Sequence, residues 1–180
     1  MLTPTEIDHT GWCPVAVRVT SPNYDSRPAG SLVELIVIHA ISLPPGQFGG
    51  EAVRQLFTNL LDPDAHPYFA EIEALRVSAH FFIRRDGELL QFVSCNDRAW
   101  HAGVSSWQTR ERCNDFSIGI ELEGDDETNF EEAQYQILNE LIAGLCRAFP
   151  IVDVVGHCDI APGRKTDPGA GFDWQRITQD

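Results

Sequence analysis

Residues 154–169 read VVGHCDIAPGRKTDPG and follow a short apolar run that contains Val152. Eleven consecutive positions of this stretch hold five side chains that could do chemistry: His157, Cys158, Asp159, Lys165 and Asp167. So high a density of polar groups, directly after a candidate strand, indicates either a solvated loop or a functional site.

Two histidines, His39 and His157, each lie at the carboxyl end of an apolar segment and directly before a loop that contains glycine and proline. In sheets covered by helices, ligands and catalytic groups gather at such strand ends. Two neutral imidazoles and one anionic group form a ligand set of catalytic zinc sites, in which the fourth position stays open for water. Cys158, Asp159 and Asp167 are all candidates for the anionic group. The residues alone favour a carboxylate over the thiol only slightly.

The other four histidines carry weaker signals. His9 and His66 lie in polar segments without evident partners, and we expect no role for them. His80 opens a candidate strand and His101 lies in RAWHAG. We expect both to be buried, hydrogen-bonded groups that support a site.

Glu121 lies in FSIGIELEG, in which Ile118, Ile120 and Leu122 alternate with other residues and share one face of a predicted strand. Glu121 is central on the opposite face. If that face borders a metal cleft, burial would raise the pKa of Glu121 toward neutrality and suit it to transfer protons.

Nearby charged residues have simpler interpretations. Glu123 and Asp125 are expected on a solvated face. A lysine such as Lys165 usually lies on the surface, but beside a metal it could stabilise a developing oxyanion.

These groups need a scaffold, and the chain predicts one. Residues 32–40 (LVELIVIHA) are typical of a central strand covered on both faces. Asp86-Gly87 sits between two apolar runs and predicts a hairpin turn, and residues 151–157 predict a further short strand.

Helical signals complete this scaffold. Residues 128–149 carry apolar positions at three- and four-residue steps, with Thr128 and Glu131 as an expected capping box and Pro150 at the end. A short helix is expected near residues 50–61. The predicted fold class is α/β (mixed α+β), with a central mixed β-sheet flanked by α-helices in one domain over residues 1–180.

Composition restricts the function classes. The 180 residues are 43% hydrophobic and 22% charged, with a formal net charge of −14. That charge argues against nucleic acid and against anionic membranes as partners. The first residues carry no basic side chain before Arg18 and no long apolar run, and the five cysteines are odd in number and at least twelve residues apart. We therefore expect a cytoplasmic protein with reduced thiols.

Four blocks carry a family resemblance: IVIHAISLPPGQFGG, AHFFIRRDGELLQFV, RAWHAGVSSWQTRERCNDFSIGIELEG and GHCDIAPGRKTDPG. In this order they resemble the zinc-dependent N-acetylmuramoyl-L-alanine amidases, which share a fold with phage amidase lysozymes and peptidoglycan recognition proteins. The resemblance runs roughly from Gly11 to Trp174. It is strongest to the cytosolic branch that serves cell-wall recycling.

The resemblance implies roles for particular residues. It implies that His39, His157 and Asp167 bind Zn²⁺, which selects Asp167 over Cys158. It implies that Glu121 is the catalytic acid and base, and that Lys165 stabilises the tetrahedral intermediate.

It also implies, more generally, that Trp100 and Arg112 line the groove for the muropeptide. One departure is Ala40, where the recycling branch often has asparagine, so a polar contact to the substrate is expected to be missing. The implied substrate is a small soluble 1,6-anhydromuropeptide, without nucleic acid, membrane or an obligate protein partner. An enzyme that trims this pool would also influence β-lactamase induction where muropeptides are the signal.

Three other functions remain to be weighed. A non-catalytic peptidoglycan-recognition module would share the fold but lack a ligand or the proton shuttle. A thiol hydrolase would use Cys158 with a histidine. A structural zinc domain usually closes all four metal positions with cysteine and histidine, whereas only three ligands are visible here.

Overall fold

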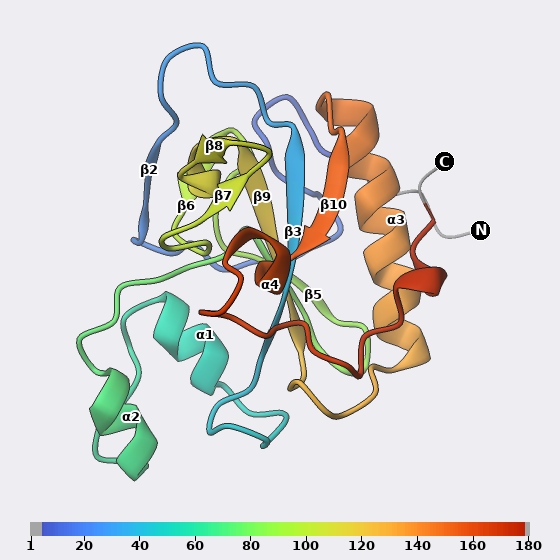
Figure 1. Cartoon of the computed structure of the whole chain (residues 1–180). Coiled ribbons are helices and arrows are strands. Elements are labelled where there is room, and N and C mark those ends of the chain that lie inside the picture. The colour runs from blue at the N-terminus through green and yellow to red at the C-terminus, as the bar shows by residue number, and fades with distance from the viewer. Residues whose placement is uncertain (1–4, 179–180) are drawn as a thin grey trace.

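The computed structural model describes residues 5–178. A six-stranded mixed β-sheet forms its centre, with the strand order β1-β5-β4-β9-β3-β10 (Figure 1). The strands are β1 (Val17–Arg18), β3 (Leu35–Ile41), β4 (Phe81–Ile83), β5 (Leu89–Gln91), β9 (Ser117–Glu123) and β10 (Asp153–Gly156). β4 and β5 are antiparallel, and the other neighbouring pairs are parallel. The predicted fold class is confirmed.

Helices and two small sheets surround this sheet. The helices are α1 (Ala52–Phe57), α2 (Pro67–Ile72), α3 (Glu132–Ala148), α4 (His157–Ile160) and the 3-10 turns η1 (Cys113–Asp115) and η2 (Trp174–Arg176). The small sheets pair β2 (Tyr24–Ser26) with β6 (Asp97–Ala99), and β7 (Ser106–Trp107) with β8 (Arg110–Glu111). Within the described part of the chain, no helix combines the length and apolar character needed to cross a bilayer.

Helix α3 covers one face of the central sheet (Figure 1). The even-numbered residues of β3 and β9 point toward it and are fully buried: Ile36, Ile38, Ile118, Ile120 and Leu122. They pack against the apolar stripe of α3, which is formed by Leu138, Leu141, Ile142 and Leu145. Burial of branched side chains on this scale is the main stabilising contribution to the sheet, at about 1.5–3 kcal/mol for each fully buried side chain.

Within residues 5–178, the opposite face of the sheet has no comparable long helix. At one end α1 and α2 pack against Phe82 of β4 and Leu90 of β5, and at the other end α4 and η1 pack against the start of β3. Along β3, Leu35 and Val37 belong to the second cluster and Ile41 packs against the first. This division places His39 and Glu121 between two apolar clusters.

Two local predictions need correction. The cap of α3 is Glu131, not Thr128, because the side chain of Gln134 accepts a hydrogen bond from the backbone N–H of Glu131 (3.0 Å). Thr128 instead belongs to a preceding turn in which Asp125 accepts its backbone N–H.

The hairpin at Asp86-Gly87 is confirmed, with only Gly87 of the pair at positive φ (89°).

Glu123 also differs from the prediction of a solvated position. It is only 4% exposed. Its carboxylate accepts hydrogen bonds from the backbone N–H groups of Gly49 and Arg85, because the loops at 42–50 and 84–88 lie over this end of β9. Asp125 is partly exposed.

Candidate active site

The register of the central sheet places His39 beside Glu121. β3 and β9 run parallel, and His39 pairs with Glu121 in the ladder. Paired residues of neighbouring strands project from the same face of a sheet. The result is a distance of 3.9 Å between His39 Nδ1 and Glu121 Oε1.

His157 reaches the same point from the next strand. β10 pairs in parallel with β3, and Gly156 lies opposite Ile38, so His157 follows at the level of His39. The chain there turns into α4, a single helical turn, rather than continuing as the predicted strand. His157 Nδ1 lies 3.0 Å from His39 Nδ1, and both side chains are buried.

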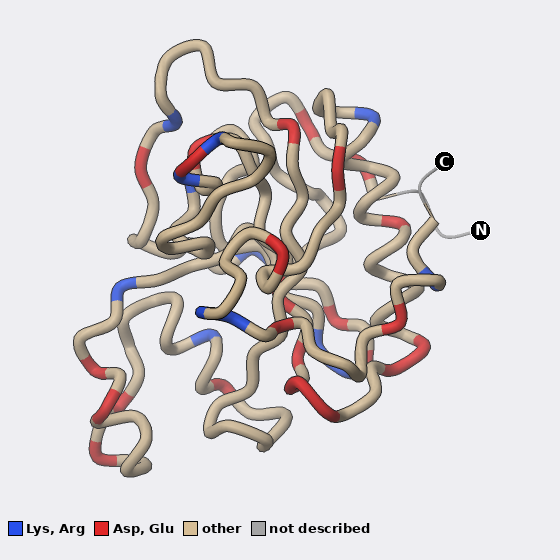
Figure 2. Tube along the Cα trace, viewed as in Figure 1, with Lys and Arg blue, Asp and Glu red and all other residues tan. Residues whose placement is uncertain are grey.

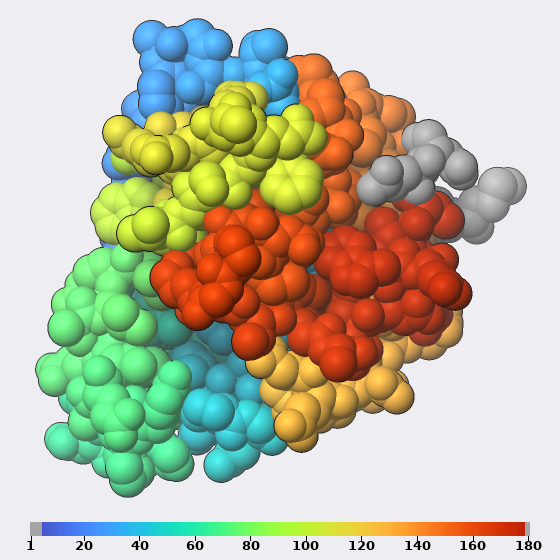
Figure 3. Space-filling view, viewed as in Figure 1, coloured from blue at the N-terminus to red at the C-terminus, as the bar shows by residue number. Residues whose placement is uncertain are grey.

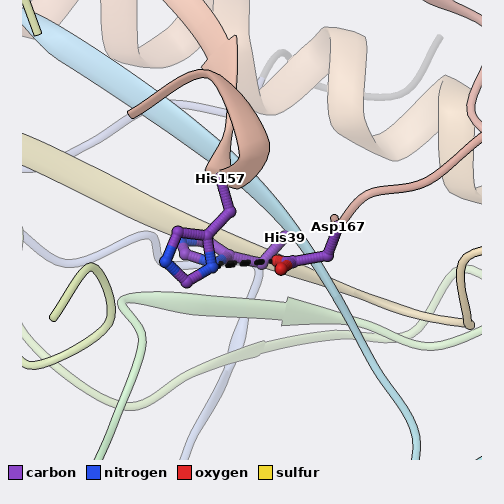
Figure 4. Close-up of side chains that lie close together, drawn as sticks. All are labelled: His39, His157 and Asp167. Carbon is purple, nitrogen blue, oxygen red and sulfur yellow. Dashed lines mark hydrogen bonds and ion pairs between the residues drawn. The ribbon is translucent and has the colours of Figure 1, made fainter. Parts of the chain in front are cut away.

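Asp167 returns to this pair on the loop that follows α4 (Figure 4). The backbone N–H of Cys158 donates to the carbonyl oxygen of Asp167 (2.9 Å), which holds the loop against α4. Asp167 Oδ2 lies 3.3 Å from His39 Nδ1 and 3.1 Å from His157 Nδ1. Among residues 5–178, His39, His157 and Asp167 form the one group whose donor atoms converge closely enough for a metal ion.

This triangle of donor atoms fits zinc. Bond lengths of about 2.0–2.1 Å in a tetrahedral site place neighbouring donor atoms roughly 3.3 Å apart, and the three observed separations are 3.0, 3.1 and 3.3 Å. His157 Nε2 lies 3.1 Å from the carbonyl oxygen of Ala102, which can only accept a hydrogen bond. The hydrogen of neutral His157 is therefore on Nε2, and Nδ1 directs a lone pair toward the other two donors.

The other two candidates for the anionic ligand do not join this triangle. Asp159 Oδ2 accepts the backbone N–H of Gly156 (2.7 Å) and so caps α4. Cys158 lies outside the converging group because the chain turns at His157. The geometry thus favours the carboxylate of Asp167, a choice that the residues alone left open.

Glu121 is a buried carboxylate with an unsatisfied oxygen. It is 8% exposed, and its Oε2 has no hydrogen-bond partner among the described residues. Burial raises the pKa of Glu121 well above its ordinary value, the negative charge of Asp167 raises it further, and Lys165 opposes the rise. A raised pKa is the direction that suits a carboxyl group to both accept and donate a proton.

The pKa values of His39 and Asp167 are lowered, whereas that of Glu121 is raised. Burial lowers the pKa of His39 to about 4, which keeps the imidazole neutral at neutral pH. Burial alone would raise the pKa of Asp167, but His157 and His39 outweigh it and hold this pKa below its ordinary value. A neutral His39 and an ionised Asp167 are the protonation states that a divalent cation requires of these two groups.

A cavity of about 640 Å³ opens over these residues. One wall carries His39, Glu121, His157, Lys165 and Asp167. The opposite wall is largely apolar and comes from the loop after β3 and from the segment of α2: Leu43, Tyr68, Ile72, Leu75 and Val77. Figure 3 shows the surface hollowed between the green segment that carries α2 and the orange-red segment that follows β10. None of these residues belongs to an element that the sequence predicts, so sequence analysis missed the apolar wall.

The two predicted groove residues lie in different places. Trp100 lines the same cavity as the histidines. Arg112 lines a second hollow of about 510 Å³ that is bordered by residues 103–106 and 160–164. Its guanidinium lies 3.4 Å from a carboxylate oxygen of Asp115. Lys165 is exposed and borders the first cavity, on the loop that also carries Asp167.

The other four histidines agree with the sequence predictions, except that His66 has a structural role that was not expected. His80 and His101 are buried and hydrogen-bonded, as expected. His9 is exposed. His66, for which no role was expected, caps α2 because its Nδ1 accepts the backbone N–H of Tyr68 (3.1 Å).

Acidic side chains dominate the charge of the whole chain, with 27 Asp and Glu against 13 Lys and Arg. Figure 2 shows the acidic positions distributed over most of the fold rather than gathered on one face.

Comparison with known proteins places the chain among amidases. The family model described as N-acetylmuramoyl-L-alanine amidase matches residues 29–170. The chain is 58% identical over 169 residues to "1,6-anhydro-N-acetylmuramyl-L-alanine amidase AmpD" of Salmonella typhimurium, covering 93% of this chain and 90% of the relative. It is equally identical to the AmpD of Escherichia coli, covering 93% and 92%.

Solved structures of amidases also resemble this chain. A crystal structure of a selenomethionine AmpD derivative superposes with a TM-score of 0.92 at 56% identity, covering 94% of this chain and 98% of that one. The Escherichia coli amidase AmiD, solved in complex with anhydro-N-acetylmuramic acid-L-Ala-D-γ-Glu-L-Lys, superposes with a TM-score of 0.59 at 30% identity. That match covers 83% of this chain and 58% of AmiD.

Proposed function

Because the chain belongs to the N-acetylmuramoyl-L-alanine amidase family, we propose that it hydrolyses the amide between the lactyl group of N-acetylmuramic acid and L-alanine. The substrates are 1,6-anhydromuropeptides released during cell-wall recycling. The names of the relatives at 58% identity over nearly their whole length support this substrate class. The products are the anhydro sugar and the free peptide.

His39, His157 and Asp167 hold a zinc ion in this proposal. Its support is the triangle of donor atoms with sides of 3.0–3.3 Å and the lone pair that His157 directs into it. When bound, zinc supplies a Lewis acid that polarises a carbonyl group and makes water more acidic.

The protein's own groups move the protons. Glu121 removes a proton from the attacking water, because its buried carboxylate lines the cavity beside His39 and has one oxygen without a hydrogen-bond partner among the described residues. It then donates that proton to the alanine nitrogen as the amide bond breaks. Lys165 borders the same cavity and is placed to stabilise negative charge on the carbonyl oxygen.

Trp100 contacts the substrate in the cavity, and the apolar wall excludes water from one side of it. Arg112 lies outside this cavity, so it can contact only a part of the substrate that extends into the second hollow. The apolar side chain of Ala40, which borders the cavity, offers no hydrogen bond there.

We place this activity in the cytoplasm, in one domain that needs no obligate protein partner. The acidic composition favours small soluble fragments over the intact, polyanionic wall. By removing peptides from anhydromuropeptides, such an enzyme would lower β-lactamase induction in cells that use them as the signal.

The observation that carries the proposal is a buried Glu121 carboxylate, with one oxygen that has no hydrogen-bond partner among the described residues, beside the converging donor atoms of His39, His157 and Asp167. A module that only recognises peptidoglycan has no need for a proton carrier at this point. A thiol hydrolase is disfavoured because Cys158 lies outside the triangle and the pKa of its thiol is raised by burial and nearby carboxylates.

The test is mass spectrometry of an anhydro-disaccharide tetrapeptide after incubation with the protein, with and without a chelator. We expect free tetrapeptide only in the sample without chelator. Binding without cleavage would favour the recognition module. Cleavage that survives the chelator but is lost in Cys158→Ser would favour the thiol hydrolase.

A further inference from the structure

A short loop passes directly behind both histidines of the candidate zinc site. His39 Nε2 lies 2.9 Å from the side-chain Nδ1 of His101. His157 Nε2 lies 3.1 Å from the backbone oxygen of Ala102. Two consecutive residues therefore contact the outer nitrogens of both imidazoles.

The contact at Ala102 favours one tautomer of His157. A carbonyl oxygen accepts only, so a neutral His157 that donates to it through Nε2 has Nδ1 free for a cation, and Asp167 Oδ2 lies 3.1 Å from that Nδ1. Arg164 also donates to this oxygen (2.7 Å), which holds it in place. The loop acts on His157 through its backbone, so no side chain of Ala102 is needed.

The outer nitrogen of His39 faces an imidazole and not a carbonyl oxygen, so its backbone surroundings do not select a tautomer. The Nδ1 of His39 lies 3.3 Å from the carboxylate of Asp167, which attracts a hydrogen to that nitrogen when no cation is bound. A bound cation needs the lone pair of Nδ1, so the hydrogen must then lie on Nε2. His39 is 1% exposed, so water cannot accept this hydrogen.

His101 is the acceptor that this state requires. When His101 Nδ1 accepts from His39 Nε2, the remaining hydrogen of His101 lies on its Nε2, which is 3.1 Å from the hydroxyl of Ser117. The hydroxyl can accept it. Each buried nitrogen in the row from His39 to Ser117 then has a partner.

We propose that His101 is a positioning residue, which accepts the Nε2 hydrogen of His39 and so holds His39 in the tautomer that binds zinc. The carbonyl of Ala102 does the same for His157. This inference rests on the proposed zinc site and adds two groups that do not touch the metal. Outer partners of metal-binding histidines typically change metal affinity about 10- to 100-fold when they are removed.

Two further residues hold the loop in position. Asn114 Oδ1 accepts the backbone N–H groups of both His101 (3.1 Å) and Ala102 (2.8 Å). Gly119 on β9 leaves the space that the imidazole of His101 fills, because a Cβ added there would lie 2.4 Å from His101 Cγ. The position of the loop that supports His39 and His157 therefore depends on the side-chain amide of Asn114 and on the absence of a side chain at Gly119.

The test compares His101→Phe with His101→Asn. Phenylalanine retains an aromatic ring but has no acceptor, whereas the Oδ1 of asparagine can occupy the place of the imidazole Nδ1. Zinc affinity of the metal-free proteins is measured by competition with a chromophoric chelator, and folding is checked by thermal unfolding. We expect zinc affinity to fall roughly 10- to 100-fold in the phenylalanine variant and to stay near wild type in the asparagine variant.

A role in packing alone predicts the reverse order, with Phe close to wild type and Asn impaired, and that result would overturn the proposal. His9→Phe is the matched control at an exposed histidine and should leave zinc affinity unchanged. Asn114→Ala should also weaken zinc binding, whereas Asn114→Asp retains the acceptor oxygen and should not.

A measurement on the unaltered protein gives an independent answer. In the zinc-loaded form, ¹⁵N NMR of the imidazoles should show the hydrogen of His101 on Nε2 and a bare Nδ1. A hydrogen on His101 Nδ1 would refute the proposal even if all variants fail to fold. If the wild-type protein binds no zinc at all, the proposed function fails, and this inference fails with it.

Discussion

Replacing Glu121 with glutamine removes the proton acceptor and changes little else. The amide has almost the same shape as the carboxylate, and the ladder between β3 and β9 keeps residue 121 beside His39. Glu121 is not part of the metal triangle, so the variant should retain zinc. We expect turnover of an anhydromuropeptide to fall by about 10²–10⁴-fold, as for other general acid–base groups.

The size of this loss separates two roles for Glu121. A loss of 10²–10⁴-fold corresponds to about 3–5 kcal/mol in the activation barrier. If Glu121 only oriented the substrate through a neutral hydrogen bond, its loss would cost about 0.5–1.5 kcal/mol, or roughly tenfold at most. The unsatisfied Oε2 and the raised pKa both favour the larger value.

The assay is the initial rate of peptide release, followed by mass spectrometry, with zinc content measured on the same samples. Glu123→Gln is the matched control, because Glu123 lies two residues along on the same face but bonds to the backbone of Gly49 and Arg85. It should keep near-normal turnover and lose some stability. Turnover within tenfold of wild type in zinc-loaded Glu121→Gln would refute the role in proton transfer.

Three further outcomes are expected. Asp167→Ala removes the one anionic member of the metal triangle, so metal analysis should show clearly reduced zinc; full occupancy would remove Asp167 from the ligand set. Burial, together with the positive charge of Arg27, lowers the pKa of His80 to about 3 in the folded protein. Between about pH 6.5 and 3 the imidazole of His80 is therefore protonated in the unfolded chain but not in the folded one. The free energy of unfolding should fall as the pH drops through this window, by up to about 1.4 kcal/mol per pH unit. Urea unfolding at pH 7 and pH 4.5 should show a smaller difference in His80→Gln than in wild type, and equal differences would contradict this assignment. Gly119→Ala forces a methyl group against the ring of His101 and should cost about 1–3 kcal/mol of stability, as overpacking does; unfolding at the wild-type urea concentration would show that the ring moves freely.

The place of Glu121 on its strand was predictable from the sequence. Alternation in FSIGIELEG placed it opposite the apolar side chains, and in the structure Ile118, Ile120 and Leu122 pack in the core beneath α3 while Glu121 lines the cavity. Alternation does not show which strands are neighbours, however. The pairing of His39 with Glu121 depends on the register of two strands about 80 residues apart, which only the folded sheet reveals.

Other features had no usable signal. Strands of two or three residues, such as Val17–Arg18 and Ser106–Trp107, are too short for a period of two to be visible. The capping box was assigned to Thr128 because the spacing to Glu131 fits the motif, but Asp125 holds Thr128 in the preceding turn. Burial of Glu123 depends on two distant loops that bring backbone donors to it, and spacing along the chain cannot show this.

Parallel strands in a sheet are held about 4.8 Å apart by their hydrogen bonds. The imidazole proposed to bind the metal and the proposed proton carrier, on opposed positions of two such strands, cannot drift relative to each other without breaking the ladder. The apolar wall of the cavity has no such restriction, since it comes from α2 and from connecting segments. For redesign, that wall is the part to exchange when a different sugar or peptide is to be accepted, while β3 and β9 are best left untouched.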